Sequence, residues 1–387
     1  MLGDRSLFPD LAPHAYLNHA GISPPSLPVQ RAVAAMAEAY ARQGGAAVGD
    51  AVRLRSRLRE LLAQLLGAAA RDIALTSGTS AGLQIIALSY PWRAGDRLLL
   101  FDGEFPANVS PWLRAAERFG LEPRFLKLTP FAEGDGSDGL AQVEAELRRG
   151  VRLVAVSAVQ YRSGLAMPLA ALASLCHAHG AALCVDAVQA CGVVPIDAPA
   201  LGIDFLAGGA HKWLMGLEGT GFLWIRPGRL EELHPVTTGW LSHEEAASFL
   251  LDGPGLLRYD RPLRTRADRF EAGSSSALSQ AALHASLELI LELGVAAIRA
   301  HVDAYLDRLE PILVERGYQS LRAPDARRRS GILSVLPPAG RGAKEIRERL
   351  AARGVAIATP DGALRFAPHW PNALGEVEQV AEALDGR

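Results

Sequence analysis

Residues 185–223 read VDAVQACGVVPIDAPALGIDFLAGGAHKWLMGLEGTGFL, and this stretch decides the fold. An apolar run ends at Asp186, Gln189 follows it, and Lys212 comes after a second apolar run and a glycine-rich turn. The carboxyl ends of parallel strands meet at one edge of an open α/β sheet, where ligands bind. We therefore expect these three side chains to lie close together at that edge.

The surrounding sequence predicts the rest of this sheet. Between about residues 73 and 226, short apolar runs alternate with longer helical patterns, which indicates parallel strands joined by helical crossovers. The predicted strands cover 73–76, 97–101, 124–128, 153–157, 182–185, 203–206 and 221–225. The predicted helices cover 80–89, 106–119, 139–148 and 168–179, preceded by one that opens at Ser26 and one over 50–66.

The pattern changes after about residue 279. A long amphipathic stretch, 280–316, is followed by short strands and two helices, and Asp361-Gly362 predicts a hairpin between 355–359 and 364–367. Residues 134–139 read as a surface loop. We expect a large domain over 18–279, and a smaller α+β domain formed by 1–17 together with 280–387.

Composition excludes several classes of function. The chain has 387 residues, 49% of them apolar and 21% charged, which predicts more than one compact unit. The balance of 40 basic and 42 acidic side chains gives no general attraction to nucleic acid or to anionic membranes. We expect no metal site and no membrane-spanning segment. Cys176, Cys184 and Cys191 lie in apolar runs, which favours free thiols and a cytoplasmic location.

Lys212 and Asp186 together suit one cofactor. A lysine amine that can form an imine with an aldehyde, and a carboxylate that keeps a pyridine nitrogen protonated, are the minimum protein chemistry for pyridoxal phosphate. Gly78, Thr79 and Ser80 lie where a predicted strand passes into a helix, so their backbone could bind its phosphate. Alone, this turn could merely cap a helix and Asp186 could merely begin a turn; in combination they favour the cofactor.

These residues resemble the class V aminotransferase and cysteine desulfurase superfamily, in the fold type I group of pyridoxal-phosphate enzymes, over about residues 16–384. The likeness is nearest to the isopenicillin-N-epimerase-like and kynureninase-like branches. It implies an α/β fold with a mostly parallel seven-stranded sheet and flanking helices. It also implies Lys212 as the Schiff-base lysine, Asp186 as partner of the pyridine nitrogen, Gln189 near the phenolic oxygen and His211 beside the phosphate.

Further segments resemble the superfamily and nominate more site residues. The run EFPAN, residues 104–108, implies Phe105 as the ring stacked on the cofactor, and LRFAPH, residues 364–369, implies Arg365 as the anchor of a substrate carboxylate. RFEAGSS, residues 269–275, resembles the segment by which a partner subunit touches the phosphate. It implies Ser274 and Ser275 there, and a homodimer that shares its active site.

Two other segments are expected on the substrate side. YLNHAG, residues 16–21, resembles the opening segment of the superfamily and nominates His19. Where many relatives have an asparagine over the cofactor, VQYRSG, residues 159–164, places Tyr161. The chain also departs from the pattern: Gly209 stands where a serine is common, and no cysteine follows Cys191, which disfavours persulfide-forming desulfuration.

The resemblance implies an enzyme that acts on an amino acid through an external aldimine and a Cα carbanion. We expect aminotransferase-like activity, with an α-keto acid as acceptor. A kynureninase-like or carbon–sulfur β-lyase and an amino-acid epimerase stay open, and an epimerase would need a second acid or base such as Tyr161 or His19. A catalytically silent regulatory protein is disfavoured by the joint presence of Lys212, Asp186 and Gln189. A dehydrogenase is disfavoured because the chain lacks a Gly-x-Gly-x-x-Gly turn.

Overall fold

The structure is a computed structural model that describes residues 1–385. In this range the main sheet has seven strands in the order β2-β8-β7-β6-β5-β3-β4. The strands are β2 (Ile73–Thr76), β3 (Arg97–Asp102), β4 (Glu122–Lys127), β5 (Val151–Ser157), β6 (Ala182–Asp186), β7 (Phe205–Gly209) and β8 (Gly221–Ile225). Strands β4, β3, β5, β6 and β7 run parallel, and β8 runs antiparallel to both β7 and β2. The mostly parallel seven-stranded sheet is therefore confirmed.

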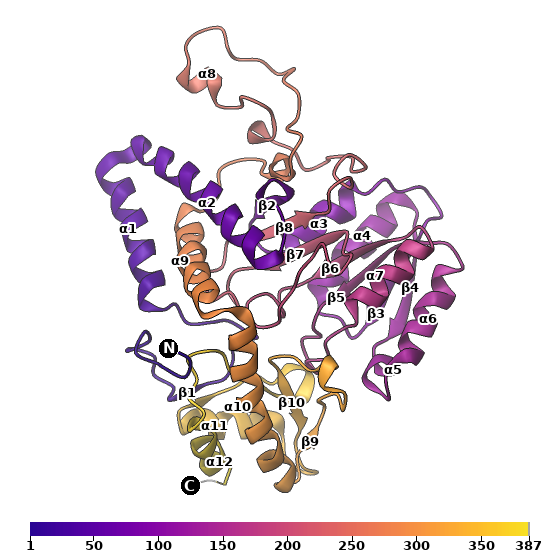
Figure 1. Cartoon of the computed structure of the whole chain (residues 1–387), viewed down its shortest axis with the longest axis vertical. Helices are drawn as coiled ribbons and strands as arrows, with labels where there is room; N and C mark the ends of the chain where they lie inside the picture. The colour runs from indigo at the N-terminus through magenta and orange to yellow at the C-terminus, as the bar shows by residue number, and fades with distance from the viewer. Residues whose placement is uncertain (386–387) are drawn as a thin grey trace.

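Helices cover both faces of this sheet (Figure 1). They are α1 (Leu27–Gln43), α2 (Val48–Leu66), α3 (Thr79–Ser89), α4 (Ser110–Phe119), α5 (Thr129–Ala132), α6 (Ser137–Leu147), α7 (Leu169–Ala178) and α9 (Ala277–Leu293). Strand side chains alternate between two apolar clusters, because successive residues point to opposite faces. Leu99 and Val154 belong to the cluster that includes residues of α2, α6 and α7, whereas Leu98 and Leu153 belong to the cluster that includes residues of α3 and α4.

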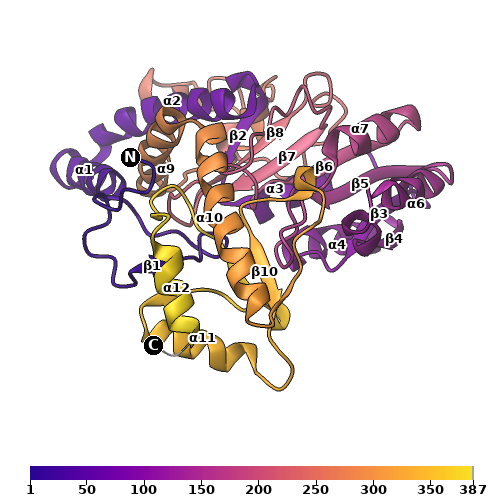
Figure 2. The same cartoon turned by 60° about the horizontal axis from the view of Figure 1, so that its bottom comes forward.

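The smaller part joins the two ends of the chain (Figure 2). It contains α10 (Val295–Glu315), α11 (Ala343–Ala352), α12 (Glu376–Asp385), β9 (Gln319–Ser320), β10 (Leu333–Leu336) and β12 (Leu364–Phe366). Strand β1 (Ala15–Tyr16) pairs in parallel with β11 (Val355–Ala356), so the N-terminal segment adds to the C-terminal part. The boundaries of the two domains stay a prediction.

Several predicted elements are wrong in their bounds. The helix over 106–119 is a 3-10 turn followed by α4, because Val109 has φ −127° and ψ −52° between them. The stretch 280–316 is two helices bent by 78°, since Gly294 breaks it at φ 79°. The loop over 134–139 is shorter, as α6 begins at Ser137. The hairpin at Asp361 forms a single bridge, Ala358 to Arg365, while β11 and β12 pair mainly with β1 and β10.

A long excursion between β8 and α9 leaves the body of the molecule. It contains the short helix α8 (Ser248–Leu251) and projects from the top of Figure 1. Several of its large apolar side chains are exposed: Val236, Trp240, Phe249, Leu250, Leu251, Leu257 and Tyr259. In the described range no single helix is long and apolar enough to cross a membrane; only α9 and α10 taken as a bent pair reach that length and composition.

Candidate active site

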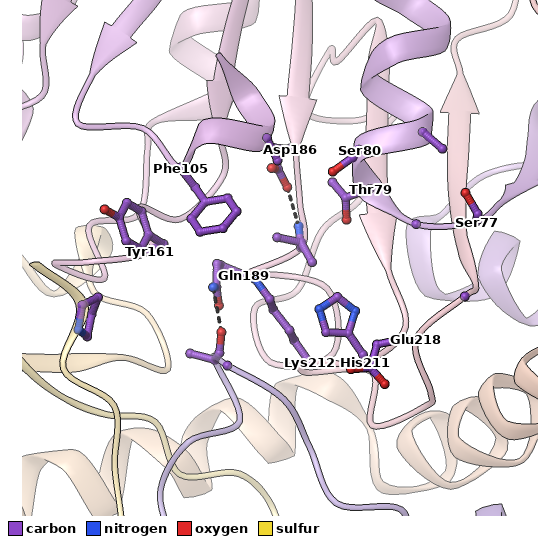
Figure 3. Close-up of a pocket in the computed structure, with 18 of the residues that line it drawn as sticks. Ser77, Thr79, Ser80, Phe105, Tyr161, Asp186, Gln189, His211, Lys212 and Glu218 are labelled. Carbon is purple, nitrogen blue, oxygen red and sulfur yellow. Dashed lines mark hydrogen bonds between the residues drawn. The ribbon is translucent and has the colours of Figure 1, made fainter. Parts of the chain in front are cut away.

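One pocket of about 580 Å³ gathers most of the predicted site residues (Figure 3). It opens at the carboxyl edge of β6 and β7, beside the turn from β2 into α3. The predicted residues that line it are Gly78, Thr79, Ser80, Phe105, Tyr161, Asp186, Gln189, His211, Lys212 and Arg365. Because these come from separate stretches of the chain, only the folded state assembles the pocket.

Lys212 enters the pocket from the turn between β7 and β8. The pKa of its amine is lowered to about 8, mainly by burial; nearby Asp186 opposes this shift and Arg365 contributes to it. The Nζ atom lies 5.4 Å from the centre of the Phe105 ring. A lysine amine with such a pKa is neutral in a substantial fraction of molecules at physiological pH, and a neutral amine can act as nucleophile or base.

Asp186 is the last residue of β6 and is buried. Its Oδ1 accepts a hydrogen bond from the Val188 backbone N–H at 3.0 Å, which Figure 3 shows as a dashed line. Burial raises the pKa of this carboxyl to about 6, against the lowering effects of that hydrogen bond and of Lys212. The charge that favours its ionised form is therefore the lysine ammonium, and a second cation in the pocket would favour that form further.

The opposite end of the pocket is suited to an anion. Gly78 precedes α3 with φ 155° and ψ 178°, a conformation that other residues rarely adopt, and a Cβ there would meet nothing within 4 Å among the described residues. Within residues 1–385, the Thr79 hydroxyl oxygen is buried without a hydrogen-bond partner. A Cβ on Gly209 would lie 2.8 Å from that hydroxyl oxygen, so Thr79 occupies the space that a serine at 209 would need. An unpaired hydroxyl and the free N–H groups of a helix start suit a phosphate.

Arg365 and Tyr161 form the side of the pocket nearest the small part. The Arg365 side chain is 6% exposed, and its Nη1 donates to the Tyr161 carbonyl at 2.9 Å. Its Nε is buried without a partner in the part of the chain that the structure describes. Burial lowers the pKa of this guanidinium to about 10, which leaves it charged at neutral pH. The Tyr161 ring packs edge-on against Phe105, with ring centres 5.3 Å apart.

Three predicted residues do not line the pocket, and one is held differently from expectation. His19 is 1% exposed and its Nδ1 lies 2.7 Å from the Ser23 hydroxyl, outside the pocket lining. Ser274 and Ser275 are exposed on the surface, as a contact with a second chain would require. The Gln189 amide lines the pocket, yet its oxygen accepts from Trp213 Nε1 at 2.8 Å and its nitrogen donates to the Ala20 carbonyl at 2.9 Å.

The sequence did not single out several residues at the site. Ser77, Glu218 and Gly219 also line the pocket. They lie next to turns that were already recognised in the sequence, and this was the available signal for them. Glu104 is 8% exposed and accepts hydrogen bonds from the Ser157 backbone N–H at 2.7 Å and from the Ser157 hydroxyl. Burial raises its pKa to about 7. Its place directly before Phe105 indicates that it fixes the loop that carries that ring.

The donor set fits pyridoxal phosphate. A buried carboxylate, a lysine amine with a lowered pKa, an aromatic ring and an open glycine turn with an unpaired hydroxyl surround one cavity in the described chain. Fold and pocket together define a pyridoxal-phosphate-dependent enzyme of fold type I.

Comparison with known proteins gives the family. The chain belongs to the class V aminotransferase family, which matches residues 16–364. Isopenicillin N epimerase of Streptomyces clavuligerus is 32% identical over 84% of this chain and 83% of its own. A probable cysteine desulfurase of Methanothermobacter thermautotrophicus is 30% identical over 77% of this chain and 72% of its own. Among solved structures, a C-DES mutant with glycine covalently linked to the PLP cofactor superposes with a TM-score of 0.86, at 25% identity and 99% coverage of both chains.

Proposed function

We propose that this enzyme removes the Cα proton of an α-amino acid and exchanges its amino group with an α-keto acid, as an aminotransferase does. The observation that carries the proposal is that a lysine amine, a buried carboxylate and a guanidinium line a single pocket, at Lys212, Asp186 and Arg365. When bound, pyridoxal phosphate supplies the acceptor for the electron pair left at Cα.

Each of these side chains has a defined task in the proposal. Arg365 binds the substrate carboxylate, because its planar guanidinium is charged and its Nε has no protein partner within residues 1–385. The Lys212 amine takes the Cα proton and, for amino transfer, would deliver it to the former aldehyde carbon of the bound cofactor and not back to Cα, since its pKa of about 8 is near the working pH. Asp186 holds a positive charge on the cofactor ring nitrogen, and that charge in turn favours the ionised carboxylate.

The pocket does not favour persulfide-forming desulfuration. That reaction needs a thiolate at the site. Cys176, Cys184 and Cys191 are all buried and none of them lines the pocket. Burial raises the pKa of Cys176 and of Cys191 to about 12, so these thiols stay protonated.

The test combines cofactor chemistry with a substrate panel. The purified enzyme should be yellow, and borohydride reduction should fix the cofactor on the peptide that contains Lys212; Lys212→Ala should abolish this fixation. L- and D-amino acids and kynurenine are then supplied with and without an α-keto acid. Amino transfer that depends on the keto acid supports the proposal. Formation of ammonia, pyruvate or alanine without the keto acid would show a β-lyase and not an aminotransferase. If no cofactor chemistry were detected, the chain would be a catalytically silent binding protein.

An epimerase is the second candidate, and one residue favours it. Epimerisation requires an acid on the face of the substrate opposite the lysine. The Tyr161 ring lines the pocket beside Phe105, whereas His19 lies outside it, which narrows the choice to Tyr161. This alternative predicts deuterium uptake at Cα with loss of optical activity. Tyr161→Phe should abolish the loss of optical activity, while proton exchange by Lys212 on one face of the substrate persists. The similarity to isopenicillin N epimerase makes the test worthwhile.

We also propose a cytoplasmic homodimer with a shared active site. Ser274 and Ser275 are exposed outside the pocket, and the apolar side chains of the excursion around α8 are exposed as well. A second copy would cover both. Light scattering gives the oligomeric state, and mixing Lys212→Ala with Ser274→Ala chains tests sharing: hybrid dimers should regain activity at one of their two sites.

A further inference from the structure

Three successive carbonyl oxygens around Lys212 receive hydrogen bonds from outside their own turn. The Ser23 backbone N–H donates to the His211 carbonyl at 2.8 Å, and the Ser23 hydroxyl donates to the Lys212 carbonyl at 2.6 Å. His369 Nε2 donates to the Trp213 carbonyl at 2.8 Å. Ser23 precedes α1 and His369 follows β12, so two segments from opposite ends of the chain hold the backbone that carries Lys212.

The direction of these hydrogen bonds follows from the neighbouring groups. The Trp370 backbone N–H donates to His369 Nδ1 at 2.8 Å, so the single proton of a neutral His369 ring lies on Nε2 and points at residue 213. The Ser23 hydroxyl donates its proton to the Lys212 carbonyl and therefore accepts from His19 Nδ1. Burial lowers the pKa of His19 and brings that of His369 to about 4, which keeps both rings neutral.

The two segments are also bonded to each other. The Ala367 N–H donates to the Leu17 carbonyl at 2.8 Å, and the His19 N–H donates to the Ala367 carbonyl at 3.1 Å. Asn372 Nδ2 donates to the Tyr16 carbonyl at 3.1 Å. The His19 and His369 rings pack edge-on with centres 5.3 Å apart. The two donors to the turn therefore belong to one connected unit.

The turn itself needs external support. Met215, three residues after the lysine, adopts φ 51°, which is unfavourable for a side chain of this size. Gly192 packs so closely that a Cβ there would lie 2.3 Å from the Trp213 carbonyl oxygen. We propose that Ser23 and His369 are positioning residues for Lys212, and that its amine is held in the pocket only while both terminal segments are docked. The proposal rests on the catalytic role proposed above for Lys212.

The test uses the full-length, cofactor-free chain, so it does not depend on catalysis. The sequence has only three lysines, and Lys127 and Lys344 are exposed, which provides two internal references. Trace acetylation with acetic anhydride between about pH 6 and 10, followed by peptide mass spectrometry, gives the titration midpoint of each amine around the lysine reference value. The charged groups that act on Lys212 are Asp186 from β6 and Arg365 from β12, with His211 as its titratable neighbour in the turn, and none of them is altered.

Ser23→Ala and His369→Phe each remove one donor to the turn. We expect each to raise the Lys212 midpoint by about one pH unit toward its ordinary value of 10.5, because a loosened amine spends more time in water. Ser23→Thr and His369→Gln keep a donor and should restore the midpoint. Ser330→Ala is the matched control: this buried hydroxyl donates to the Gly164 carbonyl at 2.7 Å and accepts from the Ile332 N–H, so its removal leaves the hydrogen bonds to residues 211–213 in place.

The results separate positioning from general stabilisation. A changed Lys212 midpoint in the Ser23 and His369 variants, with Ser330→Ala unchanged, supports the proposal. Equal midpoints in all variants would overturn it, even if Ser23→Ala unfolds more easily. Should His369→Phe fail to fold, Ser23→Ala decides the matter, since it removes one hydroxyl only. If borohydride fixes the cofactor on a different lysine, the proposed function fails while this measurement still reports on the turn.

Discussion

The cofactor-free chain should become more stable when Asp186 is replaced by asparagine. Asp186 is 3% exposed, and burial raises its pKa to about 6 from an ordinary 3.8. Because its proton affinity is higher in the folded chain than in the unfolded one, the stability it contributes is fully present below pH 3.8. That contribution is lost as the pH rises through about 6.

The magnitude follows from the two pKa values. A tenfold change in proton affinity corresponds to about 1.4 kcal/mol, so ionised Asp186 destabilises the cofactor-free chain by about 3 kcal/mol at pH 8. The asparagine of the variant would carry no charge, and its side-chain oxygen can still accept from the Val188 N–H. Asp186→Asn should therefore exceed the wild type by about 3 kcal/mol in unfolding free energy at pH 8, and by under about 1 kcal/mol at pH 4.

Urea unfolding of the cofactor-free chain from about pH 4 to pH 8 measures this difference. Asp204→Asn is the matched control, because Asp204 is a fully buried aspartate just before β7 that contacts Arg229 at 2.9 Å and His177 at 3.0 Å. Removing a paired buried charge should destabilise by about 3 kcal/mol. The reasoning would be refuted if the difference in unfolding free energy between Asp186→Asn and the wild type were the same at both ends of this pH range. It would also be refuted if the variant were less stable than the wild type at the alkaline end.

Three further changes have defined outcomes. Arg365→Ala should weaken amino-acid binding roughly 10- to 100-fold in spectral titrations of the holoenzyme, whereas Arg327→Ala, at an exposed ion pair, should leave it unchanged. Thr79→Val should leave the cofactor-free chain at least as stable, because the hydroxyl it removes has no partner within residues 1–385, but should lower cofactor affinity roughly tenfold in fluorescence titrations. Glu271→Gln should reduce the unfolding free energy by about 3 kcal/mol in urea, since this buried carboxylate pairs with Arg55 and with Arg59 at 2.7 Å; an unchanged midpoint would count against a stabilising network.

The sequence predicted the sheet well where burial was uniform, and less well where glycines were involved. Strands β2 and β8 have the predicted bounds, but β7 was placed over 203–206 and covers Phe205–Gly209. Gly208 and Gly209 were interpreted as a turn because glycine usually interrupts strands. In the structure they are buried strand residues, and a Cβ on Gly208 would lie 2.4 Å from the Phe222 ring. Close packing of the neighbouring ring explains why glycine occupies these strand positions, and a single sequence does not reveal such packing.

Most residues of the pocket could be predicted from the sequence, but the orientation and burial of individual side chains could not. Asp186 and Lys212 could be placed because strand ends of a parallel sheet converge. His19 was expected beside the substrate because its segment resembles one that lines the substrate side. The sequence does not show the orientation of a side chain, and the His19 ring is directed toward Ser23. Glu104 was missed because a lone glutamate before an aromatic residue gives no sign of burial.

The pairing of the two chain ends has a consequence for biosynthesis. Ser23 is translated before Lys212, whereas Arg365 and His369 are translated long after it. The mostly parallel sheet and its Lys212 turn are translated well before His369, the C-terminal partner of that turn. A nascent chain stalled before residue 364 would carry Lys212 without the Arg365 guanidinium and without the His369 imidazole, so the pocket is completed only after residue 369 has been translated.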